Sequence, residues 1–204
     1  MIDKIKKAYE RYEELGALLG DGSVPAGSAR YKELMKEYRK LAEWYMDNRQ
    51  LENGEFGGGL SDDSDFTNMF VGMYAMGLIP DRIKDSISRM MEAFYDQGML
   101  TNGISTIMTD GLHNYEEGMN VLNELNVIEQ GNPVLVERLM QTAKTIREYV
   151  MGVNDAGHLH VRANFYSATK MAEEGIWADV MYYAYYQVAP AMLLGDMYGN
   201  RSAR

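Results

Sequence analysis

The sequence predicts an all-α protein, a row of helical hairpins in two layers of helices with long loops gathered at one end. Two observations support this prediction. Apolar residues recur every three or four positions through most of the chain, which is the spacing of one face of an α-helix. The connections between these stretches alternate between short turns and long loops, as they do in a series of helical hairpins.

Four stretches have the pattern of amphipathic helices, with one apolar face and one charged face. The last two of them start close to a proline, Pro80 or Pro133, as the first turn of a helix often does. We expect all four helices to expose one face to water. Their apolar positions are Ile5, Ala8, Tyr12, Leu15, Leu19; Leu34, Tyr38, Leu41, Tyr45; Ile83, Ile87, Met90, Met91, Phe94; and Leu135, Leu139, Ala143, Ile146, Val150.

Three other stretches are apolar around more of the helix circumference, and we expect them to form buried helices. They cover residues 66–76, 113–128 and 172–197. Pro190 lies inside the last stretch. It should kink or split that helix, because proline lacks the backbone donor that the helix interior needs.

The loops also show a pattern. The turns at 77–80 and 130–133 are short, whereas the loops at 49–61, 98–111 and 152–167 are long. Each long loop has an Asn or Asp close to a glycine, and these glycines, Gly54, Gly103 and Gly157, follow one another at spacings of 49 and 54 residues. We interpret this as a degenerate internal repeat. Residues 158–161 alternate enough to form a short strand.

Length and composition limit the class of protein. With 204 residues we expect one domain over 1–204, with an N-terminal helical hairpin at 1–48 and repeated hairpins over 49–199. A net charge of −10 without a basic stripe argues against nucleic-acid binding. We expect no membrane span and no secretory signal, because no apolar stretch is long enough. The absence of cysteine excludes disulfides and thiolate metal sites.

The segment 53–66 is a glycine-rich turn that delivers three acids to the start of a predicted helix. Gly57, Gly58 and Gly59 stand in a row, which indicates positive φ angles or a close backbone approach. The acids Asp62, Asp63 and Asp65 suit the positive end of a helix dipole. Either they act in a site or they complement that dipole, and the residues predicted to cap the helix are Ser61, Asp62, Asp63 and Ser64.

The layout of residues 48–199 and the loop at 54–63 resemble the (α/α) toroid of carbohydrate-active enzymes, the six-hairpin glycosidases and several polysaccharide lyases. A full toroid has about a dozen helices, and this sequence predicts seven or eight. We therefore expect a piece of a toroid, a shortened toroid, or an arc completed by another copy in a homo-oligomer. The resemblance implies a polysaccharide or oligosaccharide substrate, cleaved at the long-loop end, and such breakdown usually occurs outside the cytoplasm.

Hydrolysis would use paired carboxyl groups on either side of the sugar. Acids stand near the start of three predicted inner helices, at 62–65, 116–117 and 173–174. We predict Asp63 and Glu117 as the catalytic pair, with Asp62 and Asp65 binding substrate. A separation of roughly 6.5 to 9.5 Å between the carboxyls would predict inversion, and one of roughly 5 Å retention.

Elimination would instead use the loop at 158–166, which holds two of the three histidines. A lyase needs a base for the α-proton and a cationic or amide group beside the uronate carboxylate. We predict His158, His160 and Tyr166 as catalytic residues. The predicted substrate-binding residues are His113, Asn114, Arg162, Asn164 and, for stacking on a sugar face, Trp177.

Two other interpretations were open from the sequence. Zinc or manganese at His113, His158 and His160 with a nearby acid lacks a tight ligand spacing. Calcium at Asp62, Asp63 and Asp65 has the alternate spacing of acid ligands at Asp63 and Asp65, but it lacks the downstream glycine and glutamate of an EF-hand loop. We therefore expect no metal and no cofactor. The rival to an enzyme is a non-catalytic helical-repeat module that binds a partner or assembles with itself.

Overall fold

The computed structural model describes residues 26–106, 119–162 and 167–168, and this part of the chain is mostly helical. This confirms the predicted all-α class. The chain divides into two compact units, Met1–Trp44 and Tyr45–Arg204. The helices are α2 (Ala26–Asn48), α3 (Leu60–Ala75), α4 (Pro80–Asp96), α6 (Met119–Ile128) and α7 (Pro133–Thr145), which the π-helical turn η1 (Ile146–Val150) extends; the strands are β1 (Leu100–Thr101), β2 (Ile104–Ser105), β3 (Met151–Val153) and β4 (Leu159–Val161).

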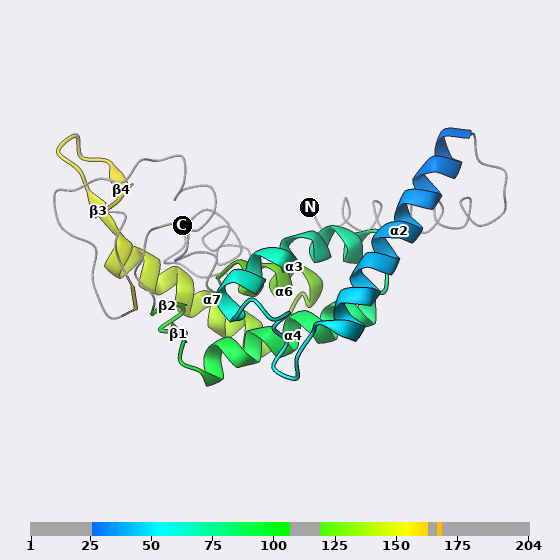
Figure 1. The fold of residues 1–204 in the computed structure, drawn as a ribbon. Helices are drawn as coiled ribbons and strands as arrows, with labels where there is room; N and C mark the ends of the chain where they lie inside the picture. Colours follow the sequence, from blue (N-terminus) through cyan, green and yellow to red (C-terminus); the bar gives the residue numbers. More distant parts are fainter. Residues whose placement is uncertain (1–25, 107–118, 163–166, 169–204) are drawn as a thin grey trace. The chain divides into compact units, whose positions relative to one another are not determined.

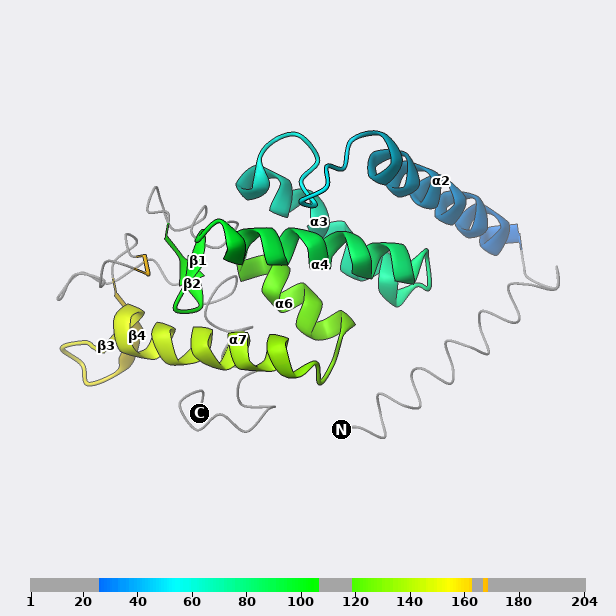
Figure 2. The ribbon, with the colours of Figure 1, turned by 90° about the horizontal axis from the view of Figure 1, so that it is seen from below.

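The described helices of the second unit form two hairpins, α3–α4 and α6–α7 (Figure 1 and Figure 2). α3 packs against both α4 and α6, and α6 packs against both α4 and α7. Both amphipathic helices begin at the predicted proline, and the Asn132 side chain caps α7 by accepting a hydrogen bond from the Val134 amide at 3.0 Å. Pro80 and Pro133 thus mark true helix starts, as the sequence predicted.

The core lies between these four helices. Ile83, Ile87, Met90, Met91 and Phe94 of α4 are buried, so the predicted apolar stripe of this helix faces the core. Every residue of α6 is buried except Val127. The buried helix predicted at 113–128 is therefore confirmed for residues 119–128. The burial predicted for 66–76 is wrong, because only Thr67, Phe70 and Met73 of that stretch are buried, whereas Asn68, Gly72 and Ala75 are exposed. Residues 113–118, the stretch 172–197 with Pro190, and the stretch at 5–19 lie outside the described residues.

An ion pair joins α4 to α7 on the outside of the two hairpins. Both terminal nitrogens of Arg138 donate to the Glu92 carboxylate, at 2.7 and 2.8 Å. The guanidinium carbon lies 3.9 Å from the ring centre of Tyr95, a cation–π contact. The hydrogen bond from Arg138 lowers the pKa of Glu92, and burial raises the pKa of Tyr95 to about 12.

Two β-hairpins interrupt the helical pattern. β4 confirms the strand predicted at 158–161, and it pairs antiparallel with β3. The β1–β2 hairpin was not predicted; its two-residue turn, Asn102-Gly103, has φ angles of 54° and 79°, as a tight hairpin turn requires. No helix in the described parts of the chain is both long and apolar enough to span a bilayer.

The loop before α3 and the β1–β2 turn each contact a helix through a glycine. Gly54 lies against the backbone of α4, and a Cβ added to it would fall 2.4 Å from the amide nitrogen of Met90. Gly103 lies against the backbone of α7, and a Cβ added to it would fall 2.4 Å from the amide nitrogen of Thr142. The Thr142 hydroxyl also donates to the Gly103 carbonyl. Each glycine therefore lies directly against a helix backbone, and a side chain at its position would push the loop away.

We therefore expect Gly103→Ala to lower the free energy of unfolding by more than 2 kcal/mol, about 1 from the left-handed backbone and the rest from the collision. Gly77→Ala is the matched control, because Gly77 has a φ of 72° with open space around it. It should cost only about 1 kcal/mol. Urea unfolding of both variants measures the difference, and equal losses would contradict a seated loop.

Candidate functional site

The glycine-rich loop is held in shape by Asp63. Its carboxylate accepts hydrogen bonds from the backbone amides of Phe56 and Gly58, the latter at 3.1 and 3.2 Å. Gly57 and Gly59 have φ angles of 100° and 91°, as the sequence predicted for this triplet. Asp63 is 8 % exposed, so a carboxyl from the first turns of α3 folds back and fixes the loop that precedes it.

The cap predictions for this helix are wrong. α3 begins at Leu60 with Gly59 in the capping position, and no side chain accepts a capping hydrogen bond there. The predicted caps, Ser61, Asp62, Asp63 and Ser64, therefore all lie inside the helix. Ser64 donates to the carbonyl of Ser61 at 2.8 Å, and the Asp63 carboxylate accepts hydrogen bonds from the loop amides of Phe56 and Gly58.

The loop is also tied to α4. Gln50 donates to the Ser86 hydroxyl at 2.6 Å and to the Gly54 carbonyl at 2.9 Å. Arg89 in turn donates to the Gln50 side chain at 3.0 Å. Below the loop the Phe56 ring packs against Phe66, with ring centres 4.9 Å apart. These hydrogen bonds and the ring contact hold the loop against α4 and the first turns of α3.

A buried polar cluster links these turns of α3 to α6. The Asn120 amide donates to the carbonyl of Ser64 at 3.1 Å, and Thr67 donates to the Glu124 carboxyl at 3.0 Å. Asn120 and Glu124 are one turn apart on α6, so both face α3. Glu124 is 8 % exposed. The cluster is defined here as Ser64, Thr67, Asn120 and Glu124, with the exposed Asp65 beside it.

Glu124 is a carboxyl in a buried setting. Burial raises the pKa of Glu124 to about 8, the Thr67 hydroxyl partly opposes that rise, and the negative charge of Asp65 adds to it. Glu124 therefore holds its proton at neutral pH. A carboxyl that stays protonated near neutrality can donate a proton to a leaving group, which is the task of a general acid.

This proton should be visible in the stability of the protein. Because the folded-state pKa of about 8 lies above the ordinary value of 4.5, the folded chain binds more protons than the unfolded chain between these pH values. The free energy of unfolding should therefore decrease as the pH rises through this range, by up to about 1.4 kcal/mol per pH unit. Glu124→Gln, which cannot ionise, should remove this contribution.

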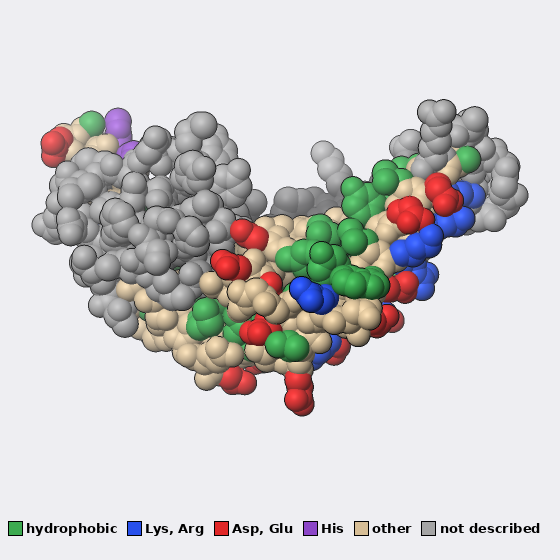
Figure 3. Space-filling view, viewed as in Figure 1, with side chains coloured by type: hydrophobic (Ala, Val, Ile, Leu, Met, Phe, Trp, Pro, Cys, Tyr) green, Lys and Arg blue, Asp and Glu red, His purple; other side chains and the backbone are tan. Residues whose placement is uncertain are grey.

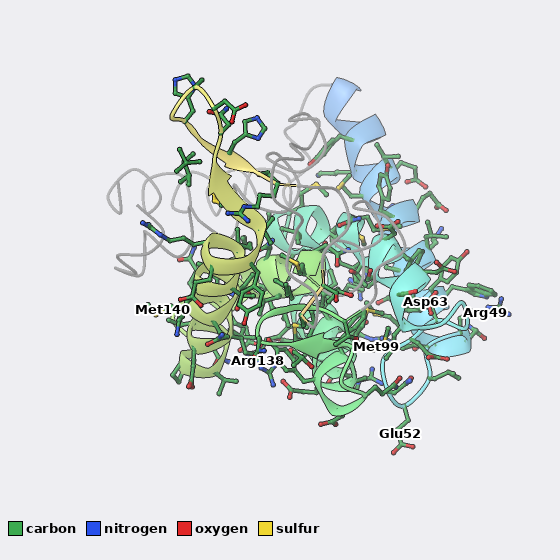
Figure 4. The ribbon with its side chains drawn as sticks, turned by 90° about the vertical axis from the view of Figure 1, so that its left-hand side faces the viewer. Arg49, Glu52, Asp63, Met99, Arg138 and Met140 are labelled. Atoms are coloured by element: carbon green, nitrogen blue, oxygen red, sulfur yellow. The ribbon has the colours of Figure 1, made fainter. Side chains whose placement is uncertain are left out.

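Urea unfolding between pH 5 and pH 8 measures the effect, as the difference between wild type and Glu124→Gln. The matched control is Glu52→Gln, since Glu52 is exposed at the tip of the loop before α3 (Figure 4). In Glu52→Gln the free energy of unfolding should depend on pH as steeply as it does in the wild type. If Glu124→Gln also keeps the wild-type pH dependence, Glu124 is ionised in the folded protein and the assignment of its proton is wrong.

Two buried polar atoms of α6 lack a hydrogen bond in the described part of the chain. Asn123 Nδ2 and Asn126 Oδ1 are buried without a hydrogen bond in the described structure. Asn123 directly precedes Glu124, and a buried amide without a partner costs free energy.

The predicted histidines lie elsewhere, on the β3–β4 hairpin. His158 is exposed, and its backbone amide donates to the Asn154 side chain at 2.9 Å. His160 is partly buried, with Nδ1 2.8 Å from the carbonyl oxygen of Val161. Figure 4 shows this hairpin well away from Asp63. The structure therefore does not bring the predicted acids and the predicted histidines together.

Some of the remaining predicted site residues are described by the structure, and the others lie outside the described residues. Asp62 and Asp65 are exposed on the first turns of α3, and Arg162 lies beside Gly152 of β3. Within the described residues no three His, Asp or Glu side chains are arranged to hold a metal ion. Outside the described residues lie Glu117, Tyr166, His113, Asn114, Asn164 and Trp177, together with Glu116, Glu173 and Glu174.

Sequence reasoning missed Glu124, because it searched for acids only near the starts of inner helices. The signal was present in the spacing: Asn120, Asn123 and Glu124 interrupt a helix whose other positions are nearly all apolar. No protein-family model matches the sequence, and no solved structure matches the chain. The chemistry of the site is therefore the basis for assigning a function.

Proposed function

We propose that this chain is a segment of a polysaccharide-degrading enzyme that cleaves glycosidic bonds, with Glu124 as the general acid. The observation that carries the proposal is the environment of Glu124: a buried carboxyl, hydrogen-bonded by Thr67, whose pKa is raised to about 8. Protonation of the glycosidic oxygen needs such a group at neutral pH. This favours hydrolysis over elimination.

The exposed Asp65 supplies the second carboxyl of the proposed pair. Its charge contributes to the raised pKa of Glu124, so the two groups lie within electrostatic reach of each other. In hydrolysis Glu124 gives its proton to the leaving oxygen, and the Asp65 carboxylate accepts a proton from the attacking water or attacks the sugar itself. The predicted pair of Asp63 and Glu117 is replaced in this proposal, since Asp63 is engaged by the loop amides.

The arrangement of helices supports an (α/α) toroid-like arc as the scaffold. α3 and α6 are neighbours, each followed by an outer helix, and the ion pair between Arg138 and Glu92 joins these outer helices. The equivalent seats of Gly54 and Gly103 add a repeated loop contact. In this arc the glycine-rich loop and the polar cluster belong to one end of the inner helices, where the proposed cleft lies.

The second candidate is the non-catalytic helical-repeat module. It is favoured by the role of Asp63, whose hydrogen bonds to the loop account for the most unusual sequence in the chain without any substrate. Elimination at His158, His160 and Arg162 remains the alternative chemistry, with His160 as the base.

Incubation of the folded chain with a panel of neutral and acidic polysaccharides tests these proposals. We expect oligosaccharides whose masses include one added water per cut, the products of hydrolysis. Products lacking that water would identify a lyase and transfer the chemistry to the histidine hairpin, where His160→Ala should then abolish turnover. No product from any polysaccharide, with the helical content intact, would favour the non-catalytic module.

A further inference from the structure

The Thr67 hydroxyl lies between two hydrogen-bond acceptors. Its oxygen is 2.7 Å from the backbone carbonyl oxygen of Ser64, one turn earlier on α3, and 3.0 Å from Oε2 of Glu124 on α6. Charged side chains spread over the surface of the described helices (Figure 3), whereas Thr67 and Ser64 are fully buried. A hydroxyl has one proton to donate, so Thr67 serves only one of these two acceptors at a time.

The proton of Glu124 decides which acceptor Thr67 serves. A protonated carboxyl is itself a donor, and it can donate to the Thr67 oxygen while the Thr67 proton goes to the Ser64 carbonyl. An ionised carboxylate has no proton to donate. It attracts the Thr67 proton instead, because a hydrogen bond to a charged acceptor is the stronger one. Both states therefore keep the 3.0 Å contact between Thr67 and Glu124, with the direction of the hydrogen bond reversed.

The Ser64 carbonyl keeps a side-chain partner when the Thr67 hydroxyl turns away. The Asn120 amide donates to this carbonyl at 3.1 Å, and Asn120 is fully buried. A buried carbonyl without a partner costs free energy. The second donor therefore lowers the cost of turning the Thr67 hydroxyl from Ser64 to Glu124.

Two groups of α3 act in opposite directions on the proton of Glu124. Among the described residues the charged group that acts on Glu124 is the Asp65 carboxylate, and α4 and α7 contribute none. Asp65 favours the protonated form, because two negative charges repel each other. The Thr67 hydroxyl favours the ionised form, because it can donate to the carboxylate.

We propose that Thr67 is a positioning residue whose hydroxyl reverses its hydrogen bond when Glu124 loses or regains its proton, and so holds that carboxyl in one place in both states. The catalytic part of this inference rests on the proposed function, since a general acid must lose and regain a proton in each cycle. The reversal needs only a rotation of the Thr67 hydroxyl. The proton that leaves is the one on Glu124, and Thr67 keeps its own.

Carbon-13 NMR of the labelled full chain, titrated between pH 5 and pH 10, tests the reversal. The Ser64 carbonyl signal should shift with the same midpoint as the Glu124 carboxyl, because this carbonyl loses the Thr67 hydrogen bond as the carboxyl ionises. Thr67→Val keeps the shape of the side chain without the hydroxyl. It should abolish the shift at Ser64 and raise the pKa of Glu124 by about one pH unit. Thr67→Ser keeps the hydroxyl and should retain the wild-type behaviour.

The Gly103 carbonyl is the matched control within the same spectra. It accepts a hydrogen bond from Thr142, whose hydroxyl also lies between two acceptors, but both of these are backbone carbonyls. Its signal should not follow the titration of Glu124. A Ser64 signal that stays constant while Glu124 titrates would overturn the proposal. A Ser64 shift of equal size in Thr67→Val, or a Glu124 carboxyl that stays in one state over the whole range, would overturn it too.

Rates of polysaccharide cleavage separate this inference from the proposed function. If Glu124 is the general acid, Thr67→Val should lower kcat by about ten-fold with KM unchanged, and Thr67→Ser should stay within about two-fold of the wild type. A wild-type kcat in Thr67→Val would overturn the catalytic part of the proposal. A reversal seen by NMR in a chain that cleaves no polysaccharide would support the positioning role of Thr67 and contradict the proposed function alone.

Discussion

Glu124→Gln should lower the rate of glycosidic cleavage by at least 100-fold while leaving the chain folded. The amide keeps the shape of the carboxyl and can still accept the hydrogen bond from Thr67, which lies 3.0 Å from the Glu124 oxygen. It has no proton to give to the leaving oxygen, and general acid catalysis typically contributes 10² to 10⁴ in rate. Initial rates of product formation on the best substrate of the panel measure the loss.

Glu137→Gln is the control for this variant, because it makes the same chemical change on the exposed side of α7. It should retain the wild-type rate. Glu124→Gln with more than a tenth of wild-type activity would contradict the role of Glu124. A substrate whose leaving group needs no proton offers a second readout, since the variant should cleave it with a much smaller loss.

The second large effect is expected for Asp63→Ala, which should lower the free energy of unfolding by about 3 kcal/mol. The substitution leaves the amides of Phe56 and Gly58 without their acceptor. Hydrogen bonds to a charged group contribute about 1.5 to 3 kcal/mol each. The amide of the buried Phe56 would lose its acceptor at a further cost, whereas Gly58 is exposed and its amide can turn to water. Urea unfolding followed by circular dichroism measures the change.

Asp62→Ala is the control, because Asp62 is exposed on the same turn of α3. It should change stability by less than about 0.5 kcal/mol. Similar losses in both variants would mean that the two acids act only through the dipole of α3. A large loss confined to Asp63→Ala would identify the carboxylate as the organiser of the glycine-rich loop.

The helices could be predicted from the sequence because their signals are local. Pro80 and Pro133 fix the first turn of α4 and α7, and the apolar stripe of α4 at Ile83, Ile87 and Met90 is the face that the structure buries. The spacing of apolar residues shows which face of a helix is apolar, and that face is buried whichever helix packs against it.

The exact start of α3 and the β1–β2 hairpin were harder to predict from the sequence. The prediction placed the cap of α3 at Ser61, Asp62, Asp63 or Ser64, although the residue in the capping position is Gly59, two residues before Ser61. The β1–β2 hairpin has strands of two residues each, too short for any alternation to be recognised. Its one local signal was the Asn102-Gly103 pair, which was interpreted as part of a repeat instead of a hairpin turn.

The polar cluster was out of reach of sequence reasoning for a different reason. Whether Glu124 is ionised depends on which helix covers it, and that helix, α3, is more than fifty positions earlier in the chain. Burial against Thr67 and the charge of Asp65 both come from this long-range contact. The composition of α6 could have indicated an unusual helix, but not the protonation state of its carboxyl.

The most direct measurement is the pH dependence of polysaccharide cleavage by the wild-type chain and by Glu124→Gln. The wild-type rate should fall as the pH rises through about 8, where Glu124 loses its proton. The residual rate of Glu124→Gln should not fall over this pH range, because the variant has no carboxyl to ionise. A wild-type rate that stays level between pH 7 and pH 9, or a folded chain that cleaves no polysaccharide at any pH, would contradict the role of Glu124 as general acid.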